Sequence, residues 1–152
     1  MIDQKQKIHD FIQQDSWLII VLDACRYDYL DNMMEVKKAY SPALNTPQWI
    51  NKTWPGEYNA TYVSGTPWIL RRYNGYEHWK NVENVWDYGW DDELKTVRPE
   101  TMAKAAKKAD DDRMVVHFMQ PHMPYRDLDS RGLGRGPKVE NVVEKYGLDK
   151  VK

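Results

Sequence analysis

The chain has 152 residues, of which 41% are hydrophobic and 30% are charged, and its formal net charge is −1. This composition excludes a disordered chain, and the near-neutral charge argues against nucleic acid as a partner. The longest apolar run is too short to span a membrane, and a single cysteine excludes an intramolecular disulfide. We expect one domain, and because no signal peptide is visible, we expect a cytoplasmic location.

Helical and extended patterns alternate along the chain. Residues 2–14 have one apolar face and predict an amphipathic helix, and the uninterrupted apolar run 17–22 is typical of a buried parallel strand. Alternating strands and helices indicate an α/β fold with a mostly parallel sheet and helices on both faces. The remaining predicted elements are a helix near 26–34, an extended piece near 36–41, a helix beginning at Thr46, a strand at 60–64, a strand near 82–86, a loop at 86–97, a helix at 99–109, a strand at 113–119, a glycine-containing loop at 126–138 and a helix at 139–147.

A carboxylate stands where the first apolar strand ends. Asp23 follows directly after Leu22, and ligands in open α/β sheets bind at the carboxyl ends of strands. An aspartate in such a dry position needs a partner, most naturally a metal ion. The same residue could instead cap a helix over 27–33. Spacing alone leaves these two interpretations equal.

Two histidines and two prolines follow the strand predicted at 113–119. Pro121 and Pro124 cannot continue a central strand or a helix, so they predict a rigid turn that holds His122 between them. A histidine on a stiff loop at a strand end is well placed to bind or protonate an anionic substrate. His117 lies within the apolar part of the strand, and we expect it to be a packed core histidine.

A hydroxyl group begins the third predicted helix. Thr46 and Pro47 are typical of the N-cap and N1 positions. The positive end of the helix dipole favours a bound phosphate or a developing alkoxide, which suits a covalent phosphoryl acceptor beside a divalent cation. Plain capping is the alternative role for Thr46, and Ser41 is a rival nucleophile.

These segments together resemble a known enzyme superfamily. Residues 22–30 look like the first metal-binding segment of the alkaline phosphatase/sulfatase superfamily, in the single-aspartate version of sulfatase-like proteins. Residues 117–125 resemble the His-x-x-x-Pro-His-x-Pro-Tyr segment of sulfatase-like proteins. Residues 41–49 and 62–67 have the layout of the family's nucleophile helix and of the strand that follows it. The resemblance covers roughly residues 15–126.

The resemblance implies a role for three residues of this sequence. Asp23 matches the first metal-ligand aspartate, Thr46 matches the hydroxyl nucleophile that also touches the metal, and His122 matches the histidine that contacts the substrate. The implied cofactor is a divalent metal ion, Mg²⁺, Mn²⁺, Ca²⁺ or Zn²⁺. The implied fold is the first half of the superfamily fold, so residues 1–152 are expected to form a single, truncated sulfatase-like domain.

Two family features are absent from the sequence. The Asp-His pair that completes the metal site does not occur, and neither does the Cys/Ser-x-Pro-x-Arg pattern of sulfatases proper. The only cysteine, Cys25, is expected to be a small buried residue. Phosphoester hydrolysis or phosphotransfer is therefore favoured over sulfate ester hydrolysis.

Two kinds of function remain open. One is a metal-dependent hydrolase that is incomplete on its own and acts on an anionic ester. The other is a non-catalytic structural or interaction module derived from the same fold. A partner chain or a homo-oligomer that completes the fold would reconcile them.

Two further clusters have a structural and a functional interpretation. The aromatic segment 68–90 could be a stacking platform for sugar or base rings, but we favour packing or a subunit interface. A carboxylate run could bind a cation, but a solvated acidic loop is the commoner case. That run comprises Asp87, Asp91, Asp92 and Glu93.

Overall fold

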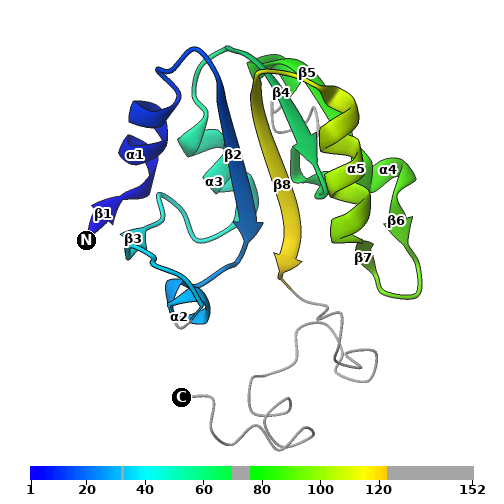
Figure 1. Cartoon of the computed structure of the whole chain (residues 1–152), viewed down its shortest axis with the longest axis horizontal. Coiled ribbons are helices and arrows are strands. Elements are labelled where there is room, and N and C mark those ends of the chain that lie inside the picture. The colour runs from blue at the N-terminus through cyan, green and yellow to red at the C-terminus, as the bar shows by residue number, and fades with distance from the viewer. Residues whose placement is uncertain (32, 70–75, 123–152) are drawn as a thin grey trace, which may run out of the picture.

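A four-stranded parallel sheet forms the centre of the protein in the computed structural model, which describes residues 1–31, 33–69 and 76–122 (Figure 1). The strand order is β2-β8-β4-β5. The strands are β2 (Trp17–Asp23), β8 (Arg113–Pro121), β4 (Tyr58–Ser64) and β5 (Trp79–Asn84). A short parallel pair, β1 (Ile2–Asp3) and β3 (Ala39–Tyr40), and an antiparallel pair, β6 (Trp90–Asp91) and β7 (Thr96–Val97), lie outside it.

Helices cover both faces of this sheet, which confirms the predicted α/β fold class. On one face, here called the α3 face, lie α1 (Gln4–Phe11) and α3 (Thr46–Thr53). On the other, the α5 face, lie α5 (Pro99–Ala109) and the short α4 (Val85–Tyr88). The remaining helical turns are α2 (Tyr27–Leu30), η1 (Pro67–Ile69) and η3 (Tyr76–His78). No helix in the described ranges is long and apolar enough to cross a bilayer.

The core of the α3 face is strongly aromatic. Trp54 is fully buried and its ring centroid lies 5.0 Å from that of Trp79 and 5.2 Å from that of Tyr58. Tyr62 of β4 packs on Trp79 at 4.8 Å. Trp79 therefore packs in the core, as predicted for the aromatic segment, whereas Trp68 of the same segment is 39% exposed.

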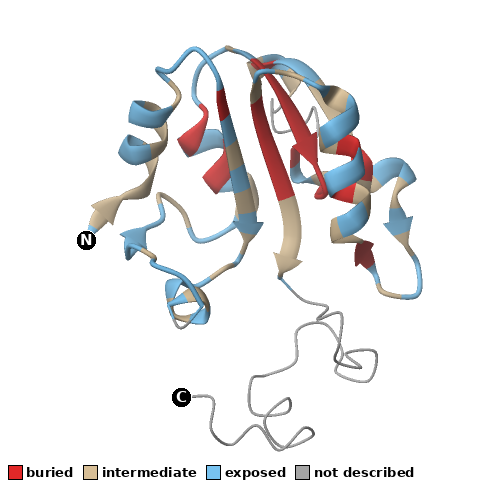
Figure 2. Ribbon diagram, viewed as in Figure 1, coloured by how far each residue is buried: buried red, intermediate tan, exposed pale blue. Residues whose placement is uncertain are grey.

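The strand β2 is parallel, as predicted, but it is buried on one face only. Trp17, Ile19 and Val21 pack in the core of the α3 face. The alternate side chains point to the α5 face and are exposed, and Figure 2 shows this alternation along β2. The prediction of a fully buried strand was wrong because, among the described elements, β2 is an edge strand and α5 covers β8 and β4 instead.

Several predicted boundaries shift by a few residues. The first helix begins at Gln4, since the Asp3 side chain accepts a hydrogen bond from the Gln6 amide at 3.1 Å and caps it. The helix expected at 26–34 shrinks to α2, and the loop expected at 86–97 contains α4, β6 and β7. The helix predicted at 99–109 has those bounds. The loop at 126–138 and the helix at 139–147 lie outside the described residues.

The register of β2 and β8 brings the two strand ends to one edge of the sheet. Val21 pairs with His117, and after a shift between Leu22 and Asp23, Asp23 pairs with Pro121. Pro121 therefore still belongs to the strand, contrary to the expectation that it ends the strand, because it stands at the very end of the ladder. The predicted convergence of these two strands at one edge is confirmed.

Candidate active site

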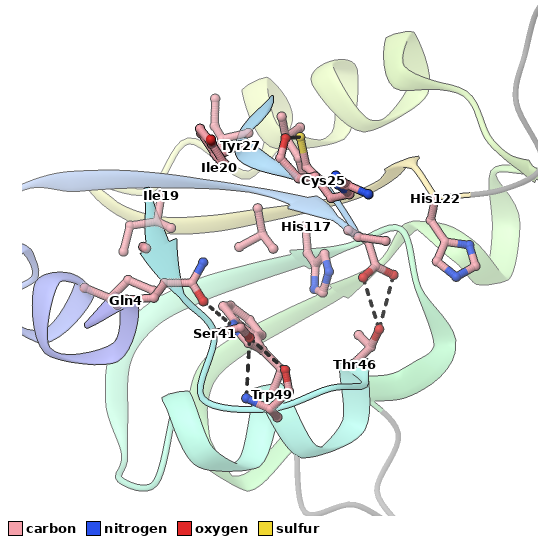
Figure 3. Close-up of a pocket in the computed structure, with 18 of the residues that line it drawn as sticks. Gln4, Ile19, Ile20, Cys25, Tyr27, Ser41, Thr46, Trp49, His117 and His122 are labelled. Carbon is pink, nitrogen blue, oxygen red and sulfur yellow. Dashed lines mark hydrogen bonds between the residues drawn. The ribbon is translucent and has the colours of Figure 1, made fainter. Parts of the chain in front are cut away.

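A pocket of about 1060 Å³ opens at the carboxyl end of β2 (Figure 3). Its walls come from β2, α1, the segment leading into α3, and the end of β8. Asp23, Thr46 and His122, the three residues singled out in the sequence, all line it. The fold therefore brings together groups that stand up to 99 positions apart in the chain, the difference between 122 and 23.

A side-chain hydrogen bond at the strand end joins Thr46 to Asp23. The Thr46 hydroxyl Oγ1 lies 3.1 Å from Asp23 Oδ1 and 3.2 Å from Oδ2, and it donates to this carboxylate. The sequence predicted that Thr46 caps the helix, and this was wrong. Asn45 is the N-cap, because its side chain accepts from the Gln48 amide at 3.0 Å. The Thr46 hydroxyl is thereby available to face the strand end.

Asp23 does not cap a helix either. The N-cap position of α2 is Arg26, and no side chain caps that helix. Within the described ranges no lysine or arginine forms an ion pair with Asp23. Ala24, the next residue, has φ 57°, a left-handed conformation that costs an alanine roughly 1 kcal/mol or more. Such strain concentrates at functional sites, which agrees with a ligand-binding role for this corner.

A buried histidine lies beside this pair. His117 is 1% exposed, and its Nδ1 lies 2.6 Å from the hydroxyl of Tyr62. When the Tyr62 hydroxyl donates to Nδ1, the ring proton lies on Nε2, which has no hydrogen-bond partner among the described residues. Burial lowers the pKa of His117 to about 4, against the opposing effect of the Asp23 charge. His117 is therefore a packed core residue, as predicted, and it is neutral; its side of the sheet also lines the pocket.

His122 lies at the far side of the same pocket. It follows the last residue of β8, and its backbone amide donates to the Met119 carbonyl at 2.9 Å, which closes a turn. Its side chain is exposed, and in the view of Figure 3 it lies to the right of His117, with Thr46 below both histidines. Pro124, the second proline of the predicted turn, lies outside the described residues.

The rival candidates are engaged elsewhere. Ser41 Oγ donates to the Ala43 carbonyl at 2.8 Å, within its own turn. Cys25 was expected to be buried but is half-buried. Desolvation raises the pKa of its thiol, which disfavours a reactive thiolate. In the acidic run, Asp91 accepts from Arg98 Nε at 2.6 Å and from two backbone amides, so it stabilises its own loop.

Sequence reasoning did not assign His117 and Trp68 to the site, although both line the pocket. The signal for His117 was its place in the strand alternation. His117 stands two residues after Val115, so its side chain lies on the α3 face. Its ladder partner there is Val21, which stands two positions before Asp23. Trp68 follows the turn after β4, where Ser64 Oγ accepts the Thr66 amide, and no spacing rule marks it.

Asp23 and Thr46 offer three hard oxygen atoms to a cation. A carboxylate and an adjacent hydroxyl suit Mg²⁺, Mn²⁺ or Ca²⁺ better than a soft metal. The described residues contain no group of three or more His, Cys, Asp or Glu side chains placed to hold a metal. The donor chemistry therefore fits a hard divalent cation, and the described part of the chain supplies only part of its coordination shell.

Comparison with known proteins adds no relative. No family model, curated protein or solved structure matches the chain. The fold class therefore rests on the structure itself, and any function rests on the geometry of the pocket.

Proposed function

We propose that the chain carries the nucleophile half of a metal-dependent phosphoester hydrolase or phosphotransferase of the alkaline phosphatase/sulfatase superfamily. The observation that carries this proposal is the contact of Thr46 Oγ1 with both carboxylate oxygens of Asp23. It sets a hydroxyl at the start of α3 against a carboxylate at the end of β2, inside a pocket large enough for a small ester.

In this proposal Thr46 attacks the phosphorus atom. The bond from Oγ1 to phosphorus forms while the bond from phosphorus to the ester oxygen breaks, and the Thr46 proton passes to solvent. A divalent cation bound at Asp23 would lower the pKa of the hydroxyl and offset charge on the phosphoryl group. Water, or a second alcohol, then releases the phosphoryl group from Thr46, which completes hydrolysis or transfer.

The surrounding residues favour an anionic substrate. Thr46 is the first residue of α3, so the positive end of the helix dipole faces the attacked group. His122 stands across the pocket, where its ring can bind a phosphoryl oxygen or protonate the leaving group. His117 stays neutral next to Asp23, so it does not compete with a cation for that carboxylate.

The proposed enzyme is incomplete in its metal shell. A hard cation takes six or more oxygen ligands, whereas Asp23 and Thr46 supply three oxygen atoms at most. Further ligands must come from water, from residues outside the described ranges, or from a partner chain or a second copy. A loosely held cation loses much of the electrostatic stabilisation that phosphoryl transfer needs, so the chain alone should turn over very slowly.

The test is covalent capture of the phosphoryl group. The chain is incubated with an aryl phosphate and Mg²⁺, Mn²⁺, Ca²⁺ or Zn²⁺ in turn, and the phosphorylated residue is mapped by mass spectrometry. Phosphothreonine at Thr46 is expected, and it should persist as phosphoserine in Thr46→Ser and vanish in Thr46→Ala. Ser41→Ala is the matched control, since Ser41 lines the same pocket and should not alter labelling.

Labelling at Ser41, or labelling that survives Thr46→Ala, would reject the proposed nucleophile. Complete absence of labelling with a cation demonstrably bound would favour the non-catalytic interaction module instead. An aryl sulfate assayed in parallel distinguishes the ester classes, and sulfate transfer faster than phosphate transfer would reverse the proposed preference.

A further inference from the structure

The pocket extends well beyond the Thr46–Asp23 pair. Its volume of about 1060 Å³ is slightly above the usual range for small-molecule sites, roughly 300–1000 Å³, and a phosphoryl group with a cation fills only a fraction of it. Figure 3 shows Thr46 and His122 at one end of the pocket and Gln4 and Ile19 at the other. The remaining space is therefore available to the group that the ester oxygen carries.

The space beyond this pair has mostly apolar walls. Residues 19–23 of β2 all line the pocket, so it runs along the edge of this strand for about 13 Å, four steps at the rise of a parallel strand. All but the last of these residues are aliphatic. Ile8 of α1 and Trp49 of α3 add to the apolar lining, and Trp49 is held in place because its Nε1 donates to Gln4 Oε1 at 2.8 Å. An apolar group gains free energy by leaving water for such walls.

The charged side chains of the lining are mostly cationic. Among the described residues that line the pocket, Asp23 is the only carboxylate. The cations there are Lys7, Arg26 and Lys37. Arg26 is paired with Asp28 at 2.6 Å, but neither lysine forms an ion pair with a described residue. Once a divalent cation offsets the charge of Asp23, the excess positive charge favours a ligand with negative charge beyond its phosphoryl group.

The two lysines belong to the end of the pocket away from the proposed nucleophile. Lys7 stands three positions after Gln4, on the same side of α1. Lys37 precedes Lys38, whose carbonyl accepts from the Ile2 amide at 3.1 Å, so it stands next to the segment from which α1 begins. A ligand that reaches either lysine must therefore pass along the apolar walls.

We propose that the substrate is an amphipathic phosphoester, whose leaving group has an apolar body and a second anionic group at its far end. This inference rests on the proposed function, since it places the phosphoryl group at Thr46 and the cation at Asp23. The apolar body lies along the edge of β2, and the second anion interacts with Lys7 or Lys37. A small polar leaving group would leave the apolar walls in contact with water.

Phosphonates, which cannot be hydrolysed, test this substrate class. Isothermal titration calorimetry of the full chain in saturating Mn²⁺ compares methylphosphonate, hexylphosphonate and 6-phosphonohexanoate, which carries a carboxylate at the far end of a similar chain. Hexylphosphonate should bind at least about tenfold more tightly than methylphosphonate, since each fully buried methylene is worth roughly fourfold in affinity. The added carboxylate should increase the affinity by a further two- to fivefold or so, the size of an exposed ion pair.

Matched lysine variants locate the anionic end. Lys7→Gln and Lys37→Gln, combined in one protein, should abolish the preference for 6-phosphonohexanoate over hexylphosphonate, and the single variants show which lysine contributes more. Lys5→Gln and Lys38→Gln are the controls, because they replace neighbouring lysines that do not line the pocket. The controls should keep the preference of the parent.

A second pair of variants tests the apolar walls. Ile20 and Leu18 stand on the same face of β2 and are 57% and 54% exposed, but only Ile20 lines the pocket. Ile20→Thr should weaken hexylphosphonate binding by about threefold, whereas Leu18→Thr should leave it unchanged. Circular dichroism verifies that each variant folds.

Equal affinities for methylphosphonate and hexylphosphonate would overturn the proposed substrate class, as would a carboxylate preference that survives the double lysine variant. If Thr46 is nevertheless phosphorylated by an aryl phosphate, the proposed nucleophile stands and only the substrate class fails. A clear preference for the longer phosphonates without any labelling of Thr46 would reject the nucleophile and support the amphipathic ligand. A cation-loaded chain that binds none of the three phosphonates would overturn both proposals.

Discussion

Two threonine–aspartate pairs lie at opposite ends of the same sheet and differ in their surroundings. At the amino end, Thr61 Oγ1 donates to Asp111 Oδ2 at 2.7 Å; at the carboxyl end, Thr46 donates to Asp23 at 3.1 and 3.2 Å. Asp111 also accepts from the Arg113 amide at 3.1 Å and from Lys80 Nζ at 3.5 Å. Asp23 accepts from Thr46, and two buried groups that its charge affects, Tyr62 and His117, are neutral.

The two pairs differ in how completely the carboxylate is already hydrogen-bonded and paired with charge. Hydrogen bonding from Thr61, with help from the Arg113 amide and Lys80, lowers the pKa of Asp111, so these groups stabilise its charged form. Asp23 has no compensating cation in the described part of the chain, and it stands at the end of the sheet where ligands bind. A saturated pair stabilises the fold, whereas an unsaturated one is available to a cation.

Cation binding should distinguish the two aspartates most strongly. Asp23→Asn should lower the affinity for Mg²⁺ or Mn²⁺ by at least about 100-fold, since even outer-shell partners of metal ligands are worth 10–100-fold. Asp111→Asn should leave the affinity unchanged, because that carboxylate is already paired. Isothermal titration calorimetry with each cation measures both. An Asp23→Asn protein that binds as tightly as the parent would show that the cation site lies elsewhere.

The pH dependence of the unfolding free energy tests whether His117, beside Asp23, is neutral in the folded protein. His117 has a folded pKa of about 4 against 6.5 in the unfolded chain, so between these values the unfolded state binds more protons. The stability conferred by neutral His117 is fully present above about pH 6.5 and is lost as the pH falls toward 4. The loss should be roughly 2 to 3 kcal/mol.

Urea unfolding of the parent and of His117→Gln between pH 4.5 and 7 measures this effect. The variant should show a clearly smaller slope of unfolding free energy against pH, whatever its absolute stability. Equal slopes would mean that His117 is not held neutral in the fold, and the contrast with the Lys80–Asp111 end of the sheet would then be weaker.

The sequence predicted the sheet and the convergence at its edge better than it predicted the details. The strand end at Asp23 was identifiable because an apolar run stops at a carboxylate, whereas β8 extends two residues beyond the predicted end at 119. The exposure of Ile20 was not identifiable, since an unbroken apolar run has no alternation and only distant elements decide which face is covered. Asn45 and Thr46 are both good N-caps, and loop geometry decides between them. The partner of His117, Tyr62, stands 55 positions away in the chain.

Without a cation, Asp111→Asn should lose more stability than Asp23→Asn, although Asp23→Asn should lose more cation affinity. Asp111→Asn should cost about 1 to 2 kcal/mol, because it weakens charge-assisted hydrogen bonds to Thr61 and to the Arg113 amide. Asp23→Asn should cost nothing measurable or stabilise slightly, since it removes a charge that no lysine or arginine of the described residues pairs with. Thermal denaturation in EDTA compares them, and a larger loss from Asp23→Asn would contradict the distinction between the two ends.

The smallest effect is expected from the two hydroxyls. Thr61 is 4% exposed, and Thr61→Val would remove the shortest hydrogen bond to Asp111 in a site that water reaches poorly, at a cost of about 1 kcal/mol. Thr46→Val should change the unfolding free energy by less than about 0.5 kcal/mol, because half-buried Asp23 can recover water in place of a longer hydrogen bond. Both substitutions keep the β-branched shape, so packing changes little and the difference reports the hydroxyl. Chemical denaturation of the two variants in EDTA measures it, and equal losses would mean that the Thr46 hydroxyl is held as firmly as a structural one.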